Sequence, residues 1–449
     1  MVASLLTRPR ASLLEVASGS ELGAAALLGA IERRAEQLAE LGVRGSGQLV
    51  LLLKANSIAF FIDLFACWRN HLTVAPLDPK LSAFELQNLQ TLCRPIALLS
   101  EGGDTLLVGA AWRELEQSAL LLFTSGTTGT PKGVNISTQA LETKLTLLRD
   151  ELGPALDGTL CALPTHFGHG LICNALPALL FGRRLAIAPR FDLEFLPTVP
   201  GLLREQQLGF MSTVPAVWTM VEKLKLDFRA TPLVRVHCAS APLHAELAAT
   251  VLTRLPLECH FFNVYGITEL AGWFGYRQIV AGERSPGRFD HWPSVERRVS
   301  ADGELCVRAP FMFSGYFPGP AAPALDAQGF FQTGDLWAGD ELKGRTKELI
   351  NRMGLKIYPQ DVERALLLTG ALEDVHVCGE EHPLYGERVV AFVVLRPGSS
   401  LEELRRALGE LLVKSKCPEA YYLVAAVLRN SRGKVTAHER QLMRASMST

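Results

Sequence analysis

The most informative segment of the sequence reads Leu122-Phe123-Thr124-Ser125-Gly126-Thr127-Thr128-Gly129-Thr130-Pro131-Lys132-Gly133. An apolar run leads here into a loop of glycine, serine and threonine residues that contains one lysine. Glycines let successive backbone N–H groups approach an anion, hydroxyls add further donors, and the lysine contributes a positive charge. The segment therefore predicts a polyphosphate site after a buried strand, and it argues against a mobile surface turn.

This loop differs from a Walker A phosphate loop at two positions. Pro131 stands before the lysine, where G-x-x-x-x-G-K-[ST] requires glycine. Gly133 stands where a serine or threonine would ligate magnesium. Both departures argue against a P-loop kinase or ATPase.

Helical and extended patterns alternate on both sides of the loop. Residues 22–41 have apolar side chains at helical spacing, Gln48 to Leu53 form a short apolar run, and Asn56 or Ser57 offers an N-cap for a helix that reaches Trp68. The later elements are expected as strands at 120–123, 184–188, 209–212, 233–238 and 260–264, and as helices after Ser137, Pro215 and Pro242. Such alternation predicts an α/β fold with mostly parallel sheets flanked by helices.

The composition along the chain changes after about Gly287. Residues 287–340 are rich in Gly, Pro and Asp, which predicts a small antiparallel or barrel-like subdomain. The following residues predict helices at 359–368 and 400–414 and strands at 375–378 and 389–395. We therefore expect a large N-terminal domain over residues 1–343 and a small α+β C-terminal domain over residues 344–449.

The overall composition narrows the partners and the compartment. The 449 residues include 45 basic and 46 acidic side chains, so the formal charge of −1 offers no basic field for nucleic acid. Nine scattered cysteines and the lack of a secretory signal predict reduced thiols and a cytoplasmic protein. The uncharged stretch 158–182 contains two prolines and several polar residues, which favours strand, loop and helix over a membrane span.

The loop at 124–133 closely resembles the most specific motif of the adenylate-forming superfamily, which includes acyl-CoA synthetases, peptide-synthetase adenylation domains and luciferases. Further matches follow in the family's order and extend the resemblance from about Gly42 to Val435. These matches are Ala75–Pro79, Ala239–Leu243, Tyr265–Glu269, Thr333–Asp335, Gly344–Glu363 and Ser431–Val435. The resemblance implies that ATP and a small carboxylic acid form an acyl-AMP with release of pyrophosphate, assisted by Mg²⁺. A phosphopantetheine thiol then accepts the acyl group.

The resemblance also implies a nucleotide site. Its phosphate-binding residues would be Thr124, Ser125, Gly126, Thr127, Thr128, Gly129 and Lys132. Tyr265 would offer a flat face to adenine, and Ala239, Ser240, Ala241, Asn263 and Gly266 would belong to the same site. Asp335 would accept hydrogen bonds from the ribose, while Arg345 would donate to the sugar or the phosphate. Taken singly, Asp335 could equally be a turn residue.

Three residues would carry the chemistry of the first step by the same resemblance. Thr268 would donate to the α-phosphate, and Glu269 would hold Mg²⁺, although alone it could equally be a helix-cap partner. Lys434 would bridge the carboxylate and the α-phosphate, although its polar segment alone suggests a solvated surface lysine. The sequence departs from the family nearby, with Leu428 in place of a proline and Asn430 in place of a threonine.

The resemblance makes Lys347 the hinge of a mobile C-terminal domain. Rotation about this hinge would withdraw Lys434 after adenylation and bring the Gly354-Leu355-Lys356 loop to the site. Domain closure would then control the chemistry. The alternative is an ordinary charged linker residue.

By the same resemblance, the acid pocket is expected at Pro164–Gly170, with His166, Phe167, Gly168 and Gly170 as its residues. Amino-acid-activating relatives have an aspartate where this sequence has Gly168, and an α-ammonium buried without a nearby anion would be costly. We therefore expect a non-amino acid as substrate. His166 and His169 could equally be structural histidines.

Two questions stay open at the level of sequence. The acceptor is free coenzyme A or the phosphopantetheine arm of an acyl or peptidyl carrier protein, and Ile357–Asp361 resembles ligases that load carriers. The alternative to an enzyme is a nucleotide-binding regulatory or scaffold protein that has kept the fold and lost the ligase chemistry.

Overall fold

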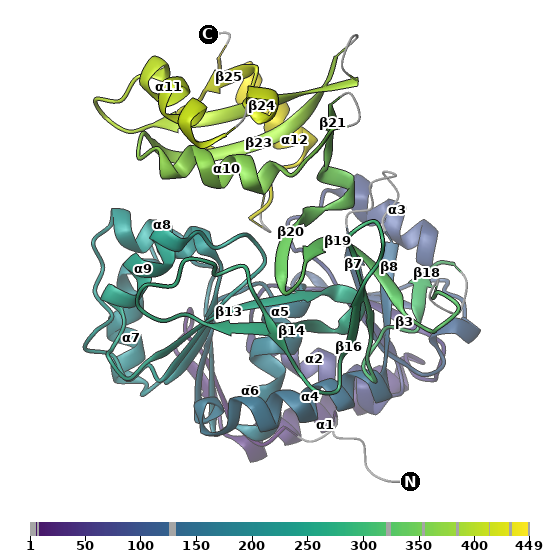
Figure 1. The fold of residues 1–449 in the computed structure, drawn as a ribbon. Helices are drawn as coiled ribbons and strands as arrows, with labels where there is room; N and C mark the ends of the chain where they lie inside the picture. The colour runs from purple at the N-terminus through teal and green to yellow at the C-terminus, as the bar shows by residue number, and fades with distance from the viewer. Residues whose placement is uncertain are drawn as a thin grey trace.

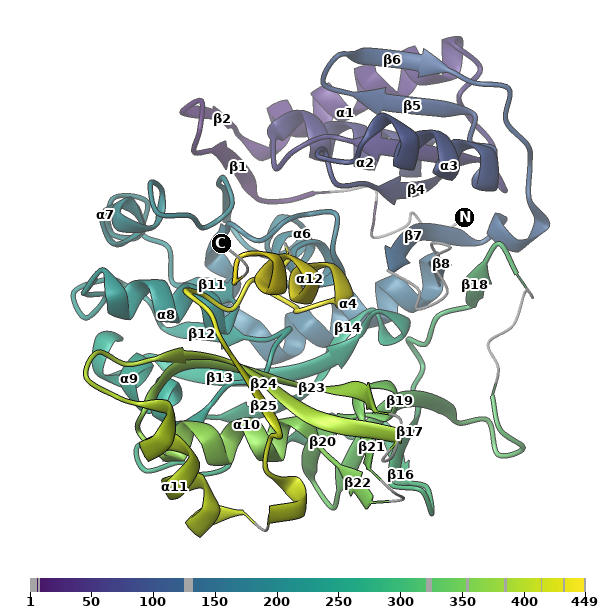
Figure 2. The same ribbon diagram turned by 90° about the horizontal axis from the view of Figure 1, so that it is seen from above.

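The computed structural model describes residue 6 and residues 9–124, 132–319, 325–352, 355–382, 386–412, 414–430 and 433–447. A large N-terminal part with two mixed sheets lies below a smaller C-terminal part (Figure 1). Seen from above, the C-terminal strands cross over β13 and β19, while α1, α2 and α3 lie to one side (Figure 2).

The first large sheet has seven strands in the order β18-β8-β7-β4-β3-β5-β6. Its parallel centre consists of β3 (Leu49–Leu53), β4 (Thr73–Pro76), β5 (Ala97–Ser100) and β7 (Ser118–Thr124). Its antiparallel members are β6 (Gly103–Leu106), β8 (Lys132–Ser137) and β18 (Gly315–Phe317). The apolar runs of the centre are buried on both faces, as expected for parallel strands between layers of helices.

The second large sheet has nine strands in the order β15-β14-β13-β12-β11-β9-β10-β1-β2. Its parallel strands are β1 (Ser12–Glu15), β9 (Gly158–Cys161), β10 (Arg184–Ile187), β11 (Phe210–Thr213), β12 (Arg235–Cys238) and β13 (His260–Ile267). Its antiparallel strands are β2 (Ser20–Leu22), β14 (Gly272–Gln278) and β15 (Asp290–His291). The prediction of mostly parallel sheets is confirmed, with antiparallel strands added at the edges.

Helices form layers between and outside these sheets. The central layer holds α2 (Ile58–Arg69), α4 (Thr138–Leu152) and α6 (Leu176–Phe181), and α1 (Ala24–Glu40) packs on α2. Helix α3 (Ala83–Cys93) covers the outer face of the seven-stranded sheet. Helices α7 (Val199–Glu205), α8 (Pro215–Lys223) and α9 (Ala245–Arg254) cover the outer face of the nine-stranded sheet.

Local chemistry sets the start of two central helices. Ser57 Oγ accepts a hydrogen bond from the Phe60 N–H at 3.1 Å, and Ser137 Oγ accepts one from the Ala140 N–H at 3.1 Å. Ser57 is one of the two N-cap candidates in the sequence, and the helix expected after Ser137 begins with that serine as its N-cap. The stretch 158–182 is strand β9 followed by α5 (Gly168–Gly170), a π-helical turn (Leu171–Ala175) and α6. Within the described residues, no helix has the length and apolar character needed to cross a membrane.

Two smaller sheets complete the fold. The region expected to form a small subdomain, residues 287–340, contains the antiparallel strands β16 (Glu296–Val299), β17 (Glu304–Arg308) and β19 (Phe331–Ala338). Strand β20 (Glu341–Arg345), just beyond this region, completes their four-stranded sheet. The C-terminal sheet contains β21 (Ile350–Arg352), β22 (Leu355–Ile357), β23 (Leu372–His382), β24 (Gly386–Leu395) and β25 (Ala420–Leu423). It is accompanied by α10 (Pro359–Leu368), α11 (Leu401–Leu411) and α12 (Ala437–Ala445). The exact domain limits at residues 343 and 344 stay a prediction.

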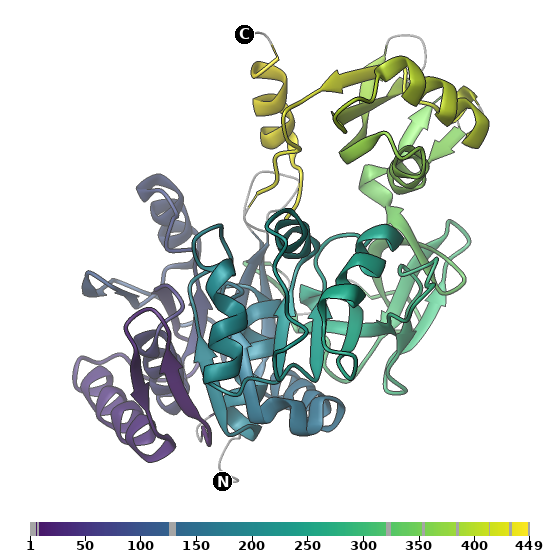
Figure 3. The same ribbon diagram turned by 90° about the vertical axis from the view of Figure 1, so that its left-hand side faces the viewer.

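Ion pairs join the C-terminal part to the large part. Arg364 in α10 pairs with Glu341 in β20 at 3.2 Å, and Lys223 in α8 lies 3.7 Å from Glu373 in β23. Helix α12 packs on the C-terminal sheet, where Met443 is buried with Val390 and Phe392 of β24, and the segment before it extends toward the large part (Figure 3). No disulfide joins the nine cysteines, all of which fall within the described ranges.

Candidate active site

Two antiparallel strands hold the ends of the predicted phosphate loop. Strands β7 and β8 pair Thr124 with Lys132, so the loop is the connection of a hairpin. Ser125, Gly126, Thr127, Thr128 and Gly129 lie outside the described residues, as does the side chain of Thr124. Their phosphate-binding roles therefore stay predictions.

Tyr316 connects the end of this loop with the predicted metal ligand. Its hydroxyl donates to Glu269 Oε1 at 2.7 Å, and Lys132 Nζ lies 5.7 Å from the centre of its ring. Burial and the nearby Glu269 carboxylate raise the pKa of Tyr316 well above its ordinary value, so the hydroxyl remains a donor. Lys132 comes from the seven-stranded sheet, whereas Glu269 follows β13 of the nine-stranded sheet. The structure therefore brings two predicted site residues together through a tyrosine that the motifs missed.

Glu269 could serve as the one carboxylate ligand of a Mg²⁺ ion. It lies with Thr268 in a short 3₁₀ turn (Thr268–Leu270), and both side chains are half-buried. Within the described ranges, no group of three His, Cys, Asp or Glu residues could hold a metal by itself. Mg²⁺ commonly takes one or two carboxylates and completes its shell with substrate phosphates and water. When bound, such an ion would neutralise phosphate charge.

Tyr265, Asp335 and Arg345 form one hydrogen-bonded cluster. The Tyr265 hydroxyl donates to Asp335 Oδ2 at 2.5 Å, and Arg345 Nε pairs with Asp335 Oδ1 at 2.8 Å. Asp335 and Arg345 face each other in the register of β19 and β20, and the aspartate side chain is only 3% exposed. Burial and then the Asp335 charge raise the pKa of Tyr265 well above its ordinary value. Three predicted nucleotide-binding residues from three strands thus meet at one point.

Other predicted nucleotide-binding residues also have structural contacts. The Tyr265 ring packs against Phe274, Phe289 and Trp337 at centroid distances of 5.2, 5.5 and 5.2 Å, and only 8% of the residue is exposed. The buried Asn263 amide donates to the Pro286 carbonyl at 2.7 Å. Packing and hydrogen bonding within the protein are enough to explain why Tyr265 and Asn263 are found here. Their roles toward adenine therefore stay predictions.

Gly266 is required by the packing of β13 against β14. A Cβ at this position would lie 2.2 Å from the Trp273 Cα and 2.3 Å from the Gly272 carbonyl oxygen. The register of the two strands shifts between Tyr265 and Gly266, which brings the backbones this close. A structural reason for the glycine therefore exists beside its predicted place in the nucleotide site.

The loop Ala239-Ser240-Ala241 links the predicted nucleotide site with the predicted acid pocket. It follows β12 directly, and Ser240 has a φ of +73°, a left-handed conformation that is uncommon for a residue with a side chain. The Ser240 hydroxyl lies 3.3 Å from His169 Nδ1. Ala239 is buried and Ser240 is exposed.

The predicted acid-pocket residues lie at the entry to α5. His166 Nε2 lies 3.6 Å from Asp78 Oδ2, an acidic neighbour that the pocket prediction did not include, and its ring is 4.1 Å from that of Phe167. A Cβ on Gly170 would lie 2.3 Å from the Pro164 carbonyl oxygen, whereas one on Gly168 would make an ordinary contact. Packing therefore requires glycine at position 170, whereas it would allow a Cβ at position 168.

Lys144 is a fully buried lysine that sequence reasoning missed. It lies in α4, donates to the Trp273 carbonyl, and has its Nζ 4.4 Å from the ring centre of Trp292 and 4.5 Å from that of Phe311. Burial lowers the pKa of this lysine to about 7, because an ammonium loses its hydration there. The rings come from distant parts of the sequence, so the helix pattern gave no signal of the burial.

Lys434 is exposed in the segment between β25 and α12. Its N–H donates to Asn430 Oδ1 at 3.1 Å, and the Asn430 N–H donates to the Lys434 carbonyl at 2.8 Å. Asn430, a departure from the family pattern, thus closes the turn that holds the lysine. This segment extends from the C-terminal part toward the large part (Figures 1 and 3), and the catalytic role of Lys434 stays a prediction.

The predicted hinge lies between two sheets. Lys347 belongs to the turn Thr346–Glu348, which connects β20 of the four-stranded sheet to β21 of the C-terminal sheet. Gly354 lies outside the described residues, and Leu355–Ile357 form β22. The position is suitable for a hinge, and the rotation itself stays a prediction.

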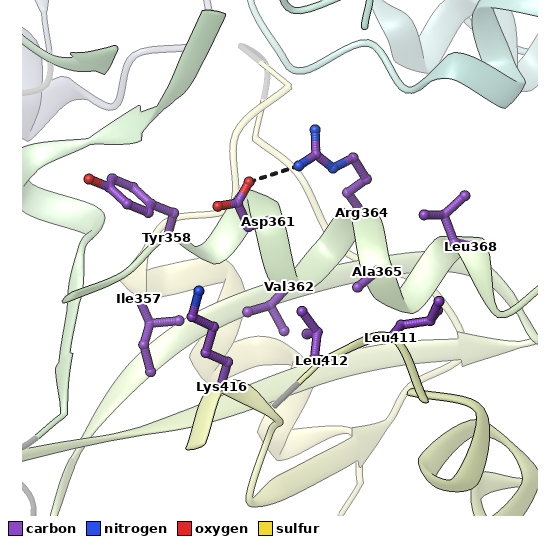
Figure 4. Close-up of a pocket in the computed structure, with 10 residues that line it drawn as sticks. All are labelled: Ile357, Tyr358, Asp361, Val362, Arg364, Ala365, Leu368, Leu411, Leu412 and Lys416. Carbon is purple, nitrogen blue, oxygen red and sulfur yellow. Dashed lines mark hydrogen bonds and ion pairs between the residues drawn. The ribbon is translucent and has the colours of Figure 1, made fainter. Parts of the chain in front are cut away.

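The C-terminal part also carries a surface hollow of about 280 Å³ between α10 and α11 (Figure 4). Asp361 and Arg364 pair across one end of it at 3.1 Å. Its lining residues are Ile357, Tyr358, Asp361, Val362, Arg364, Ala365, Leu368, Leu411, Leu412 and Lys416. None of the predicted site residues lines this hollow, so it is separate from the candidate active site.

Two segments of the chain match family models of AMP-binding enzymes. Residues 107–317 match the family model of AMP-binding enzymes, and residues 361–434 match that of the AMP-binding enzyme C-terminal domain. Together the two matches cover more than half of the chain. They include the predicted loop, Glu269 and Lys434, while Asp335, Arg345 and Lys347 fall between them.

Two of the similar curated proteins are named as CoA ligases. Peroxisomal OPC-8:0-CoA ligase 1 of Arabidopsis thaliana is 26% identical, over 97% of this chain and 90% of its own length. The probable CoA ligase CCL8 of Humulus lupulus is 30% identical, over 72% of this chain and 61% of its own length.

Solved structures share the fold. ATP-bound MatB from Rhodopseudomonas palustris superposes with a TM-score of 0.85 at 23% identity, covering 100% of this chain and 99% of the other. The o-succinylbenzoate CoA synthetase of Bacillus subtilis gives a TM-score of 0.80 at 23% identity, covering 97% and 95%. With the matching family models, the ordered motifs and the converging site residues, the chain belongs to the AMP-binding enzymes of the adenylate-forming superfamily.

Proposed function

We propose that the protein joins a carboxylic acid to the thiol of coenzyme A in two steps driven by ATP. In the first, a carboxylate oxygen bonds to the α-phosphorus of ATP and the bond to pyrophosphate breaks. In the second, the thiol sulfur bonds to the acyl carbon, the bond to AMP breaks, and the thiol proton is released. AMP is a much better leaving group than oxide, which is the chemical reason for the first step.

The observation that carries this proposal is the meeting of Lys132, Tyr316 and Glu269. The three residues lie on β8, on β18 and after β13, yet one tyrosine contacts the lysine and the carboxylate. A cation and a magnesium-type carboxylate at the end of a glycine-rich loop suit the β and γ phosphates of ATP. Thr268, next to Glu269, would then donate to the α-phosphate.

The Tyr265–Asp335–Arg345 cluster supports a ribose site beside the phosphates. An ionised carboxylate has about four acceptor positions, and two are used here, so Asp335 can still accept from ribose hydroxyls. Arg345 is 44% exposed on its side chain and can reach the sugar or the phosphate while it holds Asp335. Adenine would lie near Tyr265 and the Ala239–Ala241 loop.

The C-terminal domain would complete the site for the first step. Lys434 would bridge the attacking carboxylate and the α-phosphate, offsetting the negative charge that develops during the transfer. Rotation about Lys347 would then remove the lysine and admit the thiol. The two hydrogen bonds between Asn430 and Lys434 support this role, because they hold the backbone of the lysine against Asn430.

The acid would be a non-amino carboxylic acid bound near Phe167 and Gly168. Asp78 is an acidic group near this stretch, and it lies beside His166. Amino acids therefore belong in the substrate test as a direct challenge to this part of the proposal.

The test measures acid-dependent exchange of labelled pyrophosphate into ATP over a panel of carboxylic acids, amino acids included. We expect exchange with non-amino acids and, after addition of coenzyme A, the corresponding thioester. A parallel reaction with a phosphopantetheinylated carrier protein tests the second acceptor, and faster loading of the carrier would reverse our choice of coenzyme A. Nucleotide binding without exchange for any acid would contradict the proposed ligase and would support a binding protein.

A further inference from the structure

His237 is a buried histidine in β12 that none of the roles above uses. It is fully buried, and the ring centres of Phe210, Phe262 and Trp273 lie 5.1, 5.6 and 5.1 Å from its own. Burial lowers its pKa well below the ordinary value, and Arg235 and His169 add to the effect. The ring is therefore neutral at physiological pH.

The contact with Arg235 determines which ring nitrogen carries the proton. Arg235 Nε donates to His237 Nε2 at 2.8 Å, and a guanidinium has no acceptor, so Nε2 must offer its lone pair. The proton of the neutral ring is then on Nδ1. Arg235 itself is fixed by the Glu151 carboxylate at 2.7 Å and the Glu151 carbonyl at 2.9 Å. His237 thus presents a fixed Nδ1–H donor.

This donor has no acceptor within the part of the chain that the structure describes. The buried Ser212 hydroxyl also has no hydrogen-bond partner among the described residues, and Ser212 lies beside His237 in the register of β11 and β12. Nε2 of His169, whose charge state influences His237, is a third buried polar atom without a partner among the described residues. Buried polar groups in folded proteins are nearly always paired with protein, water or ligand, so this group points to a bound molecule.

The three atoms lie next to the proposed acid pocket. His237 is two positions before Ala239 and faces the central helical layer with Phe210 and Phe262 of the neighbouring strands. His169 belongs to the Pro164–Gly170 stretch and contacts Ser240 at 3.3 Å. An acid with its carboxylate at the Ala239 end would extend its tail along β12 toward His237.

We propose that His237 Nδ1–H, with the Ser212 hydroxyl beside it, binds an oxygen atom at the far end of the acid substrate. The substrate is then an oxo- or hydroxy-substituted carboxylic acid and not a plain hydrocarbon acid. This inference rests on the proposed ligase function. A second carboxylate is disfavoured, because the adjacent cation, Arg235, is already paired with Glu151.

The experiment compares matched acids that differ only at the distal position. One pair is an oxo acid and the alkanoic acid of equal chain length, and another is a hydroxyaryl acid and its methylaryl counterpart, each pair tested at several lengths. The readout is the ratio of kcat/KM within a pair in pyrophosphate exchange. We expect the best oxygenated acid to exceed its partner by about 10- to 100-fold, since the unpaired donors reject the hydrocarbon.

Variants of His237 assign this ratio to the donor. His237→Leu removes the donor and should bring the ratio close to one. His237→Asn keeps an N–H near the Nδ1 position and should restore part of the preference. Ser212→Ala removes only a hydroxyl and should lower the ratio less, which keeps the test usable if the leucine variant does not fold. Val236→Ala, buried on the opposite face of β12, is the matched control and should keep the wild-type ratio.

Each outcome separates this inference from the proposed function. Exchange with equal rates for both members of every pair, as expected if buried water alone satisfies His237, would overturn the oxygenated substrate. An undiminished ratio in both His237→Leu and Ser212→Ala would overturn the role of these two residues. Absence of exchange with every acid would overturn the proposed ligase itself.

Discussion

The two sides of the candidate active site treat their buried polar groups in opposite ways. On the nucleotide side, Tyr265, Asp335 and Arg345 satisfy one another at 2.5 and 2.8 Å. On the acid side, His237 and Ser212 each have a buried polar atom without a partner among the described residues. A satisfied network rigidifies the fold without a ligand, whereas an orphaned donor needs one. The contacts of the nucleotide side are therefore complete within the fold, whereas on our proposal a bound substrate completes those of the acid side.

The largest expected effect comes from breaking the satisfied side with Asp335→Ala. We expect exchange activity to fall by about 1000-fold, because ribose binding and the orientation of Arg345 are lost together. Stability should fall by about 2–3 kcal/mol, since the buried Tyr265 hydroxyl loses its acceptor. Pyrophosphate exchange and urea unfolding measure the two effects. Asp340→Ala, at an exposed pair 3.8 Å from Arg288, is the control and should change stability by less than about 0.5 kcal/mol.

The next effect tests the phosphate end through Glu269→Gln. Glutamine keeps an oxygen for the Tyr316 hydroxyl and removes the negative charge, so only metal binding should suffer. We expect exchange to fall by about 100-fold and to recover in part at high Mg²⁺. Tyr316→Phe, which keeps the carboxylate, should cost only about 3- to 10-fold. An unchanged dependence on Mg²⁺ in Glu269→Gln would argue against the metal role.

The third prediction concerns Lys144, whose backbone partner Trp273 also contacts His237. Its pKa is about 7 in the fold and 10.5 as the ordinary value, so between these pH values the unfolded chain binds a proton that the folded chain does not. Stability therefore rises with pH over this window. Lys144→Met should remove the dependence, and its stability relative to wild type should increase by about 2–3 kcal/mol on going from pH 9 to pH 7.

Urea unfolding at pH 7, 8 and 9 measures this change. Lys80→Met, at an exposed lysine, is the matched control and should leave the pH profile of stability as in wild type. A constant difference between wild type and Lys144→Met over this range would show that Lys144 keeps its ordinary pKa.

The sequence predicts features that depend on neighbouring residues better than those that depend on distant ones. Ser57 and Ser137 identify helix starts because capping uses residues three positions away. The phosphate loop is recognisable because its donors are consecutive in the chain. Tyr316 and Lys144 could not be found in this way, since their partners Glu269 and Trp292 are distant in sequence. Pairing between distant segments depends on strand order and register, which local patterns do not encode.

The same limit applies to the interpretation of single residues. The sequence alone allows Asp335 to be a turn residue, whereas the pairing of β19 and β20 places it between Tyr265 and Arg345. Gly266 resembles a motif glycine, yet the close approach of β14 already requires it. His237 belongs to a short apolar strand in the sequence, and its orphaned donor becomes visible only with Arg235 and Ser212 in place.

The most direct test of the proposed chemistry separates the two half-reactions in Lys434→Ala. The variant should bind ATP as wild type does and form the thioester from a preformed acyl-AMP and coenzyme A. Its acid-dependent pyrophosphate exchange should fall by at least about 100-fold, because the bridge between carboxylate and α-phosphate is lost. Lys414→Ala, at another exposed lysine of the same domain, should retain both reactions. Full exchange in Lys434→Ala would contradict acid activation by closure of the C-terminal domain over the nucleotide.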